Sequence, residues 1–442
     1  MNIFIIFICK IIQFFLTMFG KGSSFPGKAA YRINKHILSY FKLPEKAIFV
    51  TGTTGKSSVS HMLSEIYRKD GMVVANNEKG SNLIFGVIST LIANSRINGQ
   101  IKADAVVLEI DERSIKYALQ YIKPTYLIIT NLSRDQLARN GHYDLVFKEI
   151  NDYIKEETCL VLNGDDPTTM MFSLNKKNKI LFFGLKKTLL SLKDTSSVLD
   201  TAYCPICNRK LEFKYFHYGN LGNYECNHCD FKRPKIKYEA SMIDINNYMI
   251  GNDKIKLKNS AIYNIYNILA CYTVAVDSKI AVKNVVEHIN NMNLDFKRTT
   301  NFEYDKINGE ILLSKNETPI SYNQSIDYVV GNNSKKTIAL GFLNVSGRYS
   351  KKDLSWLYDI DFEKLNNKSI EKIILVGPFA LNLLLRLKYG GIDPSRVIIC
   401  EDYHEIIDFL IKETKTKIYC LFYFDLEKKF KKEIVSKGGK IW

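Results

Sequence analysis

Short, uninterrupted hydrophobic runs recur through the first part of the chain, and stretches of helical periodicity separate them. The runs are residues 47–50, 105–108, 126–130, 159–162 and 180–183. Strands that are apolar throughout are buried on both faces, which is typical of a mostly parallel sheet covered by helices. Helical periodicity returns at residues 264–276, so the pattern predicts an α/β domain over residues 41–300.

A second series of hydrophobic runs begins near residue 301. It comprises residues 337–340, 373–376, 397–399 and 418–422, with a helix-like segment at 381–389. This alternation predicts a smaller, doubly wound α/β domain over residues 301–442. Between the two series, residues 200–235 lack the rhythm of strand and helix, and we interpret them as an insertion in the first domain.

The N-terminal segment, residues 1–40, begins with a very apolar stretch at residues 1–19 that only Lys10 and Gln13 interrupt. A membrane span needs about 20 apolar residues, and a signal peptide needs a basic start and a small-residue cleavage site. Neither pattern fits well, because no Lys or Arg precedes Lys10. We therefore expect an apolar helix that packs on the domain or lies at a membrane surface, with a true anchor as the alternative.

Composition narrows the classes of function. With 442 residues, 46% of them hydrophobic, the chain is long enough for two or three domains and too apolar for disorder. A formal net charge of +16 favours anionic partners such as nucleotides, phospholipid headgroups, cell-wall precursors or nucleic acid. The lysine cluster at residues 428–440 is interpreted as a solvated helix face. An odd total of nine cysteines favours a reducing, cytoplasmic compartment.

Residues 51–58, with the sequence TGTTGKSS, join the run 47–50 to a stretch of helical periodicity. Strand, glycine turn and helix in this order are typical of a phosphate-binding loop, where backbone N–H groups and the helix dipole face the phosphates. Lys56 can reach the β- and γ-phosphates, and the Ser57 hydroxyl can ligate Mg²⁺. The predicted ATP-binding residues of the loop are Gly52, Thr53, Thr54, Gly55, Lys56, Ser57 and Ser58. The alternative is an ordinary tight turn before a helix.

Two further positions are candidates for the same site. Glu109 follows the run 105–108, so its carboxylate is expected at the carboxyl end of a strand beside the loop, as a second Mg²⁺ ligand and a catalytic residue. Glu112 is the fallback, and a solvated turn acid is the alternative. Asn264 and Asn267 begin a predicted helix, where their side chains could cap the helix or read the edge of a base.

Four cysteines form two CxxC pairs, 204–207 and 226–229, with 226 − 207 − 1 = 18 residues between the pairs. This is the spacing of a zinc ribbon, so Cys204, Cys207, Cys226 and Cys229 are the predicted Zn²⁺ ligands. A site of four thiolates leaves no coordination position open, so the metal is expected to stabilise the insertion and not to catalyse.

Together these motifs resemble the Mur ligase family, and within it the MurT branch. The short loop, with Val50 where a full Walker A motif has glycine, is similar to that of Mur ligases and folylpolyglutamate synthases. Residues 130–137 (TNLSRDQL) and 163–167 (NGDDP) resemble two more Mur motifs. The four-cysteine insertion and residues 353–363 (DLSWLYDIDFE) resemble the MurT branch. Departures from the family pattern occur at Ala138, Ala261 and Thr300.

The resemblance implies a Mur-like fold and an ATP-dependent amidation. The α-carboxylate of D-Glu in the lipid II stem peptide would be phosphorylated, and ammonia would attack the acyl phosphate to give D-isoglutamine. Arg298 and Lys315 would join the loop and the two asparagines as ATP contacts. The ammonia would come from a class I glutaminase subunit similar to GatD.

The same resemblance gives Asp353 the role of orienting the partner's catalytic His across the interface between the subunits. The alternative is that Asp353 only caps the segment that follows it, in which case Asp359 or Asp361 would serve the partner.

Two other functions fit the sequence less well: a folylpolyglutamate-type ligase and a zinc-ribbon protein that binds nucleic acid. The four-cysteine insertion counts against a folylpolyglutamate-type ligase. A zinc-ribbon protein that binds nucleic acid is weakly favoured by the net charge, but no aromatic and basic stripe adjoins the cysteines. We therefore expect no nucleic-acid partner, lipid II as a substrate at the membrane surface, and a cytoplasmic protein at the inner face of the plasma membrane.

Overall fold

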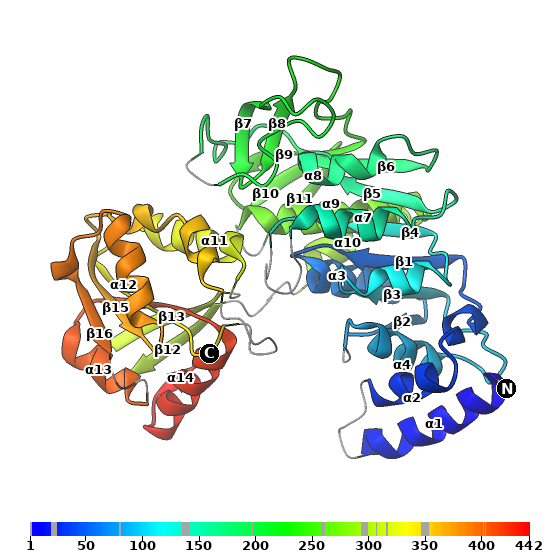
Figure 1. Ribbon diagram of the computed structural model, residues 1–442, viewed down its shortest axis with the longest axis horizontal. Coiled ribbons are helices and arrows are strands. Elements are labelled where there is room, and N and C mark those ends of the chain that lie inside the picture. The colour runs from blue at the N-terminus through cyan, green and yellow to red at the C-terminus, as the bar shows by residue number, and fades with distance from the viewer. Residues whose placement is uncertain are drawn as a thin grey trace. The chain divides into compact units, whose positions relative to one another are not determined.

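The computed structural model describes residues 2–18, 24–78, 81–134, 142–195, 198–257, 261–292, 299–305, 307–314, 317–345, 353–400, 402 and 404–442. The chain forms two compact units. Unit 1 is Met1–Ser133, Tyr143–Thr195 and Leu199–Asp295, and unit 2 is Arg134–His142, Ser196–Val198 and Phe296–Trp442. Each unit has a sheet and a core of its own (Figure 1). The domain limits at residues 40, 300 and 200–235 stay predictions.

A nine-stranded sheet forms the centre of unit 1 within the described residues, in the order β11-β10-β9-β6-β5-β4-β1-β3-β2. Its strands are β1 (Lys46–Thr51), β2 (Val74–Asn76), β3 (Ala105–Glu109), β4 (Tyr126–Ile129), β5 (Cys159–Asn163), β6 (Ile180–Leu185), β9 (Tyr238–Asp244), β10 (Asn247–Ile250) and β11 (Asp253–Lys256). In this sheet order, all neighbouring strands between β2 and β9 pair in parallel, whereas β10 pairs antiparallel with both β9 and β11. All the uninterrupted apolar runs of the first series became strands.

Helices pack on this sheet from both sides. They are α3 (Lys56–Lys69), α4 (Ile84–Asn94), α5 (Ile115–Leu119), α7 (Tyr143–Asn151), α8 (Pro167–Met170), η2 (Met171–Ser173), α9 (Ile262–Asp277) and α10 (Val282–Asn291). Phe49 of β1 packs in a core cluster with residues of α4, α5 and α7. Its neighbours Ile48 and Val50 point to the opposite face, where α3 contacts β1 and α9 packs on α3.

In the described part of the chain, three helical elements precede β1: α1 (Asn2–Met18), α2 (Phe25–Ile33) and η1 (Ile37–Tyr40). Helix α1 packs against α2 and α4, and the three lie together in Figure 1. The predicted apolar N-terminal helix is therefore present and packed on the domain. Among the described residues, we find no helix with the length and hydropathy to cross a membrane.

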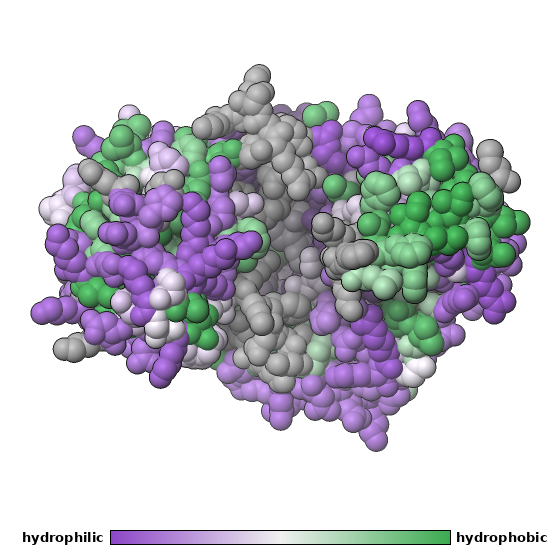
Figure 2. All heavy atoms as spheres, turned by 90° about the horizontal axis from the view of Figure 1, so that it is seen from below, coloured by the Kyte–Doolittle hydropathy of each residue, from purple (hydrophilic) through white to green (hydrophobic). Residues whose placement is uncertain are grey.

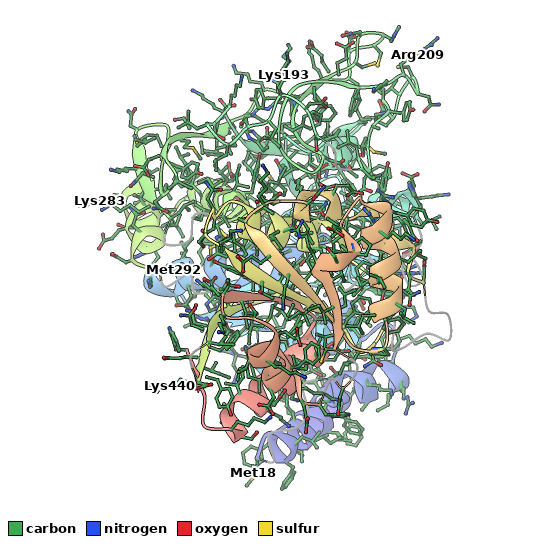
Figure 3. The ribbon with its side chains drawn as sticks, turned by 90° about the vertical axis from the view of Figure 1, so that its left-hand side faces the viewer. Met18, Lys193, Arg209, Lys283, Met292 and Lys440 are labelled. Carbon is green, nitrogen blue, oxygen red and sulfur yellow. The ribbon has the colours of Figure 1, made fainter. Side chains whose placement is uncertain are left out.

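The insertion at residues 200–235 has its own small fold. Strands β7 (Glu212–Tyr218) and β8 (Leu221–Glu225) form a separate two-stranded antiparallel sheet. A small core of Cys204, Leu211, Tyr224, Cys226 and Phe231 lies beneath the cysteine turns. Arg209, in the loop between the first CxxC pair and β7, lies at the outer edge of the insertion (Figure 3).

Unit 2 is built on a seven-stranded sheet within its described residues, in the order β16-β15-β14-β17-β13-β12-β18. The strands are β12 (Thr299–Tyr304), β13 (Ile307–Leu313), β14 (Lys336–Gly341), β15 (Ile370–Val376), β16 (Val397–Cys400), β17 (Lys417–Phe422) and β18 (Lys440–Ile441). The helices are α11 (Pro319–Val330), η3 (Ser355–Asp359), η4 (Phe362–Leu365), α12 (Ala380–Tyr389), η5 (Pro394–Arg396), α13 (Ile406–Glu413) and α14 (Phe424–Ser436). Strands β13 to β17 are parallel, so the predicted fold class, two α/β units with mostly parallel sheets, is confirmed.

Candidate functional site

The loop at residues 52–55 turns sharply between β1 and the first residue of α3. Gly52 has a φ of +127°, and a Cβ there would lie 2.3 Å from Thr130 Oγ1. Gly55 has a φ of +82°, and a Cβ there would lie 2.6 Å from Asn267 Oδ1. Both positions therefore require glycine for conformation and for space. The loop thus has the predicted strand, glycine turn and helix.

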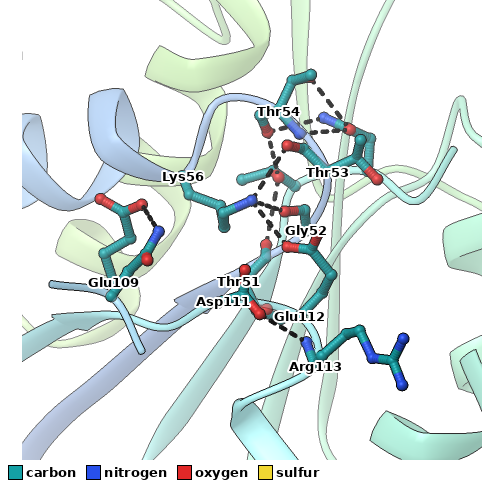
Figure 4. A network of polar contacts seen from close by, with 12 residues as sticks. Thr51, Gly52, Thr53, Thr54, Lys56, Glu109, Asp111, Glu112 and Arg113 are labelled. Carbon is teal, nitrogen blue, oxygen red and sulfur yellow. Dashed lines mark hydrogen bonds and ion pairs between the residues drawn. The ribbon is translucent and has the colours of Figure 1, made fainter. Parts of the chain in front are cut away.

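Lys56 is the first residue of α3, and its side chain folds back into the loop (Figure 4). Its Nζ lies 3.0 Å from Glu112 Oε2 and 3.1 Å from the Thr53 carbonyl oxygen, and it also donates to the Gly52 carbonyl. The side chains of Lys56 and Glu112 are 10% and 3% exposed, so water screens this ion pair little. The Lys56 ammonium and the N-terminal end of α3 both place positive charge at the loop, and the Glu112 carboxylate offsets part of it.

Glu109 ends β3 as predicted, but the carboxylates of Glu109 and Glu112 have different partners. Glu109 Oε1 accepts a hydrogen bond of 2.8 Å from Asn82 Nδ2. Its backbone N–H and carbonyl pair reciprocally with the Asn77 side chain at 2.9 and 2.8 Å. The structure therefore places both acids beside the loop, with Glu112, the fallback residue, on Lys56 and Glu109 on the asparagines (Figure 4).

The segment after β4 supports the loop from the side. Asn131 Oδ1 accepts from the Thr54 N–H at 3.1 Å, and Asn131 Nδ2 donates to the Thr54 carbonyl at 3.1 Å. Thr130 Oγ1 donates to the same carbonyl at 2.6 Å, and the Ser133 N–H donates to Thr53 Oγ1 at 3.0 Å. We had not predicted Thr130 and Asn131 as site residues. The signal was available, because a residue that ends a strand next to β1 must lie beside the loop.

Helix α9 brings one predicted asparagine directly to the loop. Asn267 lies against Gly55 although more than two hundred residues separate them in the sequence. Asn264, one turn earlier, is also buried. Ser57 is exposed and Ser58 half-buried in the first turn of α3, at the positively polarised helix end. The other two predicted ATP contacts, Arg298 and Lys315, lie outside the described residues.

The four cysteines of the insertion come together in space. Their sulfur atoms all lie within 4.8 Å of one another, and two pairs, Cys204–Cys229 and Cys207–Cys226, are 3.4 Å apart. Four sulfurs at about 2.3 Å from a tetrahedral Zn²⁺ are about 3.8 Å apart, so the donor set fits that ion. A hydrogen bond from the His228 backbone N–H lowers the pKa of the Cys226 thiol to about 7, whereas desolvation and the neighbouring thiols raise the pKa of Cys207 and Cys229.

A buried ionic network joins the insertion to the central sheet. Asp165, in the turn after β5, is completely buried, and its Oδ1 lies 2.6 Å from Arg233 Nε. Asp165 Oδ2 accepts from Tyr266 Oη of α9 and from the Leu185 N–H, each at 2.7 Å. Arg233 also pairs with Glu239 at 2.8 Å. The NGDDP turn therefore holds three elements together, a role that its sequence did not reveal.

The next residue in that turn, Asp166, caps α8. Its side chain accepts from the Thr168 N–H at 2.9 Å, so it satisfies one free donor of the helix N-terminus. Burial raises the pKa of Asp166 to about 7, despite this hydrogen bond. The carboxyl is thus poised to change charge near neutral pH.

In unit 2, Asp353 makes the capping contact of the alternative interpretation. Its Oδ1 accepts from the Ser355 N–H at 2.8 Å at the start of η3. Across the residues that the structure describes, its Oδ2 has no hydrogen-bond or ion-pair partner. The two substitutes are engaged with cations, Asp359 with Arg134 at 3.0 Å and Asp361 with Lys364 at 3.4 Å.

Comparison with known proteins relates this geometry to a family. Residues 50–275 match the Mur ligase middle domain, and residues 313–425 match the MurT ligase C-terminal domain. The MurT subunit of lipid II isoglutaminyl synthase (glutamine-hydrolyzing) from Staphylococcus aureus (strain COL) is 31% identical over 385 residues, 86% of this chain and 85% of that one. The chain belongs to the MurT branch of the Mur ligase family.

Other relatives extend this result. The MurT subunit of Streptococcus pneumoniae (strain ATCC BAA-255 / R6) is 27% identical over 441 residues, 96% of this chain and 95% of that one. A pseudomurein peptide ligase type C from Methanothermus fervidus has the same fold, with a TM-score of 0.68, 21% identity, and coverage of 91% of this chain and 81% of that chain. As a MurT-type Mur ligase, the chain is an ATP-dependent ligase.

Proposed function

We propose that this chain is the synthetase subunit of a lipid II isoglutaminyl synthase. The γ-phosphoryl group of ATP passes to an oxygen of the D-Glu α-carboxylate, and ADP leaves. Ammonia then attacks the acyl carbon and loses a proton, the bond to the phosphate oxygen breaks, and the carboxamide of D-isoglutamine remains. The observation that carries this proposal is the buried, glycine-framed Lys56 in a chain that also matches the MurT C-terminal domain.

Within this reaction the loop residues bind and neutralise the phosphates. Lys56 exchanges part of its contact with Glu112 and the loop carbonyls for the phosphate oxygens, and stabilises the negative charge that is transferred. The loop residues from Gly52 to Ser58 hold the triphosphate, and Asn267 holds the loop against α9. We assign Asn264, Asn267, Arg298 and Lys315 to the rest of the nucleotide.

Two metal ions fit the residues present. Mg²⁺ would neutralise phosphate charge, and Ser57 and Glu109 are the proposed ligands because Ser57 lies in the first turn of α3 and Glu109 ends β3, the strand beside β1. Glu112 remains the second choice, since it already carries the ion pair with Lys56. Zn²⁺ would be held by Cys204, Cys207, Cys226 and Cys229, where it closes the insertion.

The ammonia is proposed to come from a GatD-like class I glutaminase bound to this chain. Asp353 is the proposed orienting residue for the partner's catalytic His, since a carboxylate fixes the imidazole tautomer and stabilises its charged form. Asp353 is half-buried, and capping η3 engages one of its two carboxylate oxygens, so the capping and orienting roles are compatible. Asp359 and Asp361 would have to leave an arginine or a lysine first.

The Asp353→Asn variant tests this assignment. Asn keeps the acceptor for the Ser355 N–H but cannot stabilise an imidazolium, so glutamine-dependent amidation should fall by a factor of roughly 10³ to 10⁴ while amidation by free ammonium persists. Amidation of lipid II in the presence of the glutaminase is measured with each nitrogen source.

Asp393→Asn is the matched control, because Asp393 makes the same contact to the Ser395 N–H at 2.9 Å. It should leave both rates unchanged. Equal loss with glutamine and with ammonium would move Asp353 to the ligase site or the fold, and no loss would leave it as a cap only.

An ATP-hydrolysis assay separates this function from the nucleic-acid-binding alternative. ATP hydrolysis that rises with a muropeptide supports the cell-wall ligase, whereas hydrolysis that rises with DNA would support a nucleic-acid-binding protein. Since lipid II is held in the plasma membrane, the proposed reaction takes place at the cytoplasmic face of that membrane.

A further inference from the structure

Helix α1 has its hydrophobic residues on the outside. All of its exposed residues, among those whose exposure the structure describes, are apolar: Ile3, Phe4, Phe7, Ile11, Phe14, Phe15 and Met18. Their spacing places them on one continuous face of the helix. Figure 2 shows this face as a broad hydrophobic area, and Met18 lies at the outer end of the helix in Figure 3. A soluble protein normally turns such a face inward.

Three polar residues of α1, Asn2, Lys10 and Gln13, contact the rest of unit 1. Lys10 Nζ donates to the Ala93 carbonyl of α4 at 3.4 Å, and Gln13 Nε2 donates to the Ser89 carbonyl at 3.5 Å. Asn2 Oδ1 accepts from Asn34 Nδ2 at 2.8 Å. Ile5, Ile6 and Cys9 are buried beside these contacts in the core of unit 1. The orientation of α1 is therefore fixed by packing and hydrogen bonds to α4 and α2, and every exposed residue of its outer face that the structure describes is apolar.

The surroundings of this face are positively charged. Residues 1–44 contain six Lys and Arg and no Asp or Glu. Lys28, Arg32 and Lys35, on or just after α2, are exposed, and so are the apolar Phe25 and Ile33 of the same helix. An apolar helix face beside exposed basic residues is complementary to a surface that is apolar within and anionic outside, which is the surface of a bilayer with acidic lipids.

We propose that α1 and α2 form a lipid-binding surface, on which α1 lies in the plane of an anionic membrane with its Phe and Ile side chains among the acyl chains. A span is not involved, because no helix among the described residues has the required length and hydropathy. The charge argues for lipid over a second copy of this chain, since two copies would bring the same excess of cations together. Docking beside lipid II rests on the proposed function, whereas lipid binding itself does not.

Vesicle sedimentation of the full-length protein tests the proposal. The protein should bind vesicles of phosphatidylglycerol and phosphatidylcholine, and bind phosphatidylcholine alone much more weakly. Phe4→Ser/Phe7→Ser/Phe14→Ser should weaken binding roughly tenfold or more, because three exposed aromatic side chains are lost from the interface. Leu145→Ser/Leu189→Ser/Tyr389→Ser, which changes residues of similar exposure elsewhere, should bind as the wild type does.

A charge variant provides the second measurement. Lys28→Gln/Arg32→Gln/Lys35→Gln should weaken binding to the anionic vesicles and reduce its dependence on salt, while the fold and ATP binding stay unchanged. Binding that neither triple variant weakens would overturn the proposal. The proposal would also be overturned if the wild type did not bind vesicles and instead used this face of α1 to form a dimer or to bind the glutaminase. The Phe variant would then lose that association.

Amidation assays keep this result separate from the proposed function. The Phe variant should amidate a water-soluble muropeptide at the wild-type rate and lipid II in vesicles more slowly. A wild type that binds vesicles but amidates neither substrate would refute the proposed function and leave the lipid-binding surface in place.

Discussion

The glycine loop and the four-cysteine insertion are both encoded by short spacing patterns, yet the fold completes them in different ways. All four sulfurs, and the small core beneath them, come from one short stretch of chain. The loop, by contrast, is completed by Glu112 after β3, Asn131 after β4 and Asn267 on α9. A metal site can be specified locally because identical ligands need only a common distance, whereas a phosphate site needs charges and hydrogen bonds from several strands.

Asp165 is one buried residue through which the two regions meet. Asp165 contacts Arg233, just after the second cysteine pair, and Tyr266 on the helix that carries Asn267. The insertion is therefore not an independent attachment, because its base shares an ionic network with the helix that closes the loop. Substitutions at Asp165, in the glycine loop and in the insertion test how far stability, activity and metal binding of the two regions are independent.

The largest effect is expected at the connection itself. Asp165→Ala leaves Arg233 with the Leu185 carbonyl and the more exposed carboxylate of Glu239, and loss of one partner of a buried ion pair costs about 3–5 kcal/mol of stability. The free energy of unfolding of unit 1 is measured by urea titration. Glu239→Gln, which removes the other carboxylate from the same arginine, should cost less than about 1 kcal/mol. Equal costs would mean that Asp165 does not hold the regions together.

The next effect concerns the loop alone. Lys56→Ala should lower the amidation rate by roughly 10²–10³, because the charge on the transferred phosphoryl group loses its buried counterion. Lys69→Ala, at the exposed end of the same helix, is the control and should keep full activity. The steady-state amidation rate and the zinc content of the protein are both measured. The metal content should stay unchanged, and wild-type activity of Lys56→Ala would remove the loop from the ATP site.

A smaller effect on activity is expected from the insertion. Cys226→Ser should release the metal and open residues 200–235 to hydrogen exchange, while ATP affinity changes little because the Asp165 network remains. Metal analysis and hydrogen exchange are the measurements. Cys159→Ala, outside the cluster, should retain one metal ion per chain. Full metal occupancy of the Cys226 variant would contradict the proposed ligand set.

The last effect is gradual and appears as a change in the slope of stability with pH. Asp166 has a folded pKa of about 7, above its ordinary value, so the folded chain binds more protons than the unfolded chain between roughly pH 4 and 7. Stability should fall as pH rises through this window, by at most about 1.4 kcal/mol per pH unit. Asp166→Asn keeps the cap and should flatten that fall in urea titrations. An unchanged slope would assign the pH dependence to other groups.

Much of the fold was predictable because buried parallel strands leave a plain record in the sequence. The runs at 105–108 and 159–162 became β3 and β5 almost residue for residue, since a strand buried on both faces must be apolar throughout. The cysteine spacing likewise predicted four sulfurs in one place. Residues 52–58 indicated a phosphate loop in the sequence, because the backbone conformation of glycine and the polarity of a helix end depend on only a few neighbouring residues.

The tertiary structure alone decided which distant groups those local motifs meet. It placed Glu112 on Lys56 and Asn131 on the loop, because parallel pairing aligns the ends of strands that lie far apart in sequence. It turned Asp165 inward to Arg233, although its neighbour Asp166 is a simple cap. It also turned the apolar face of α1 outward: hydrophobicity predicts a helix that avoids water, but only packing against α2 and α4 determines which side remains exposed.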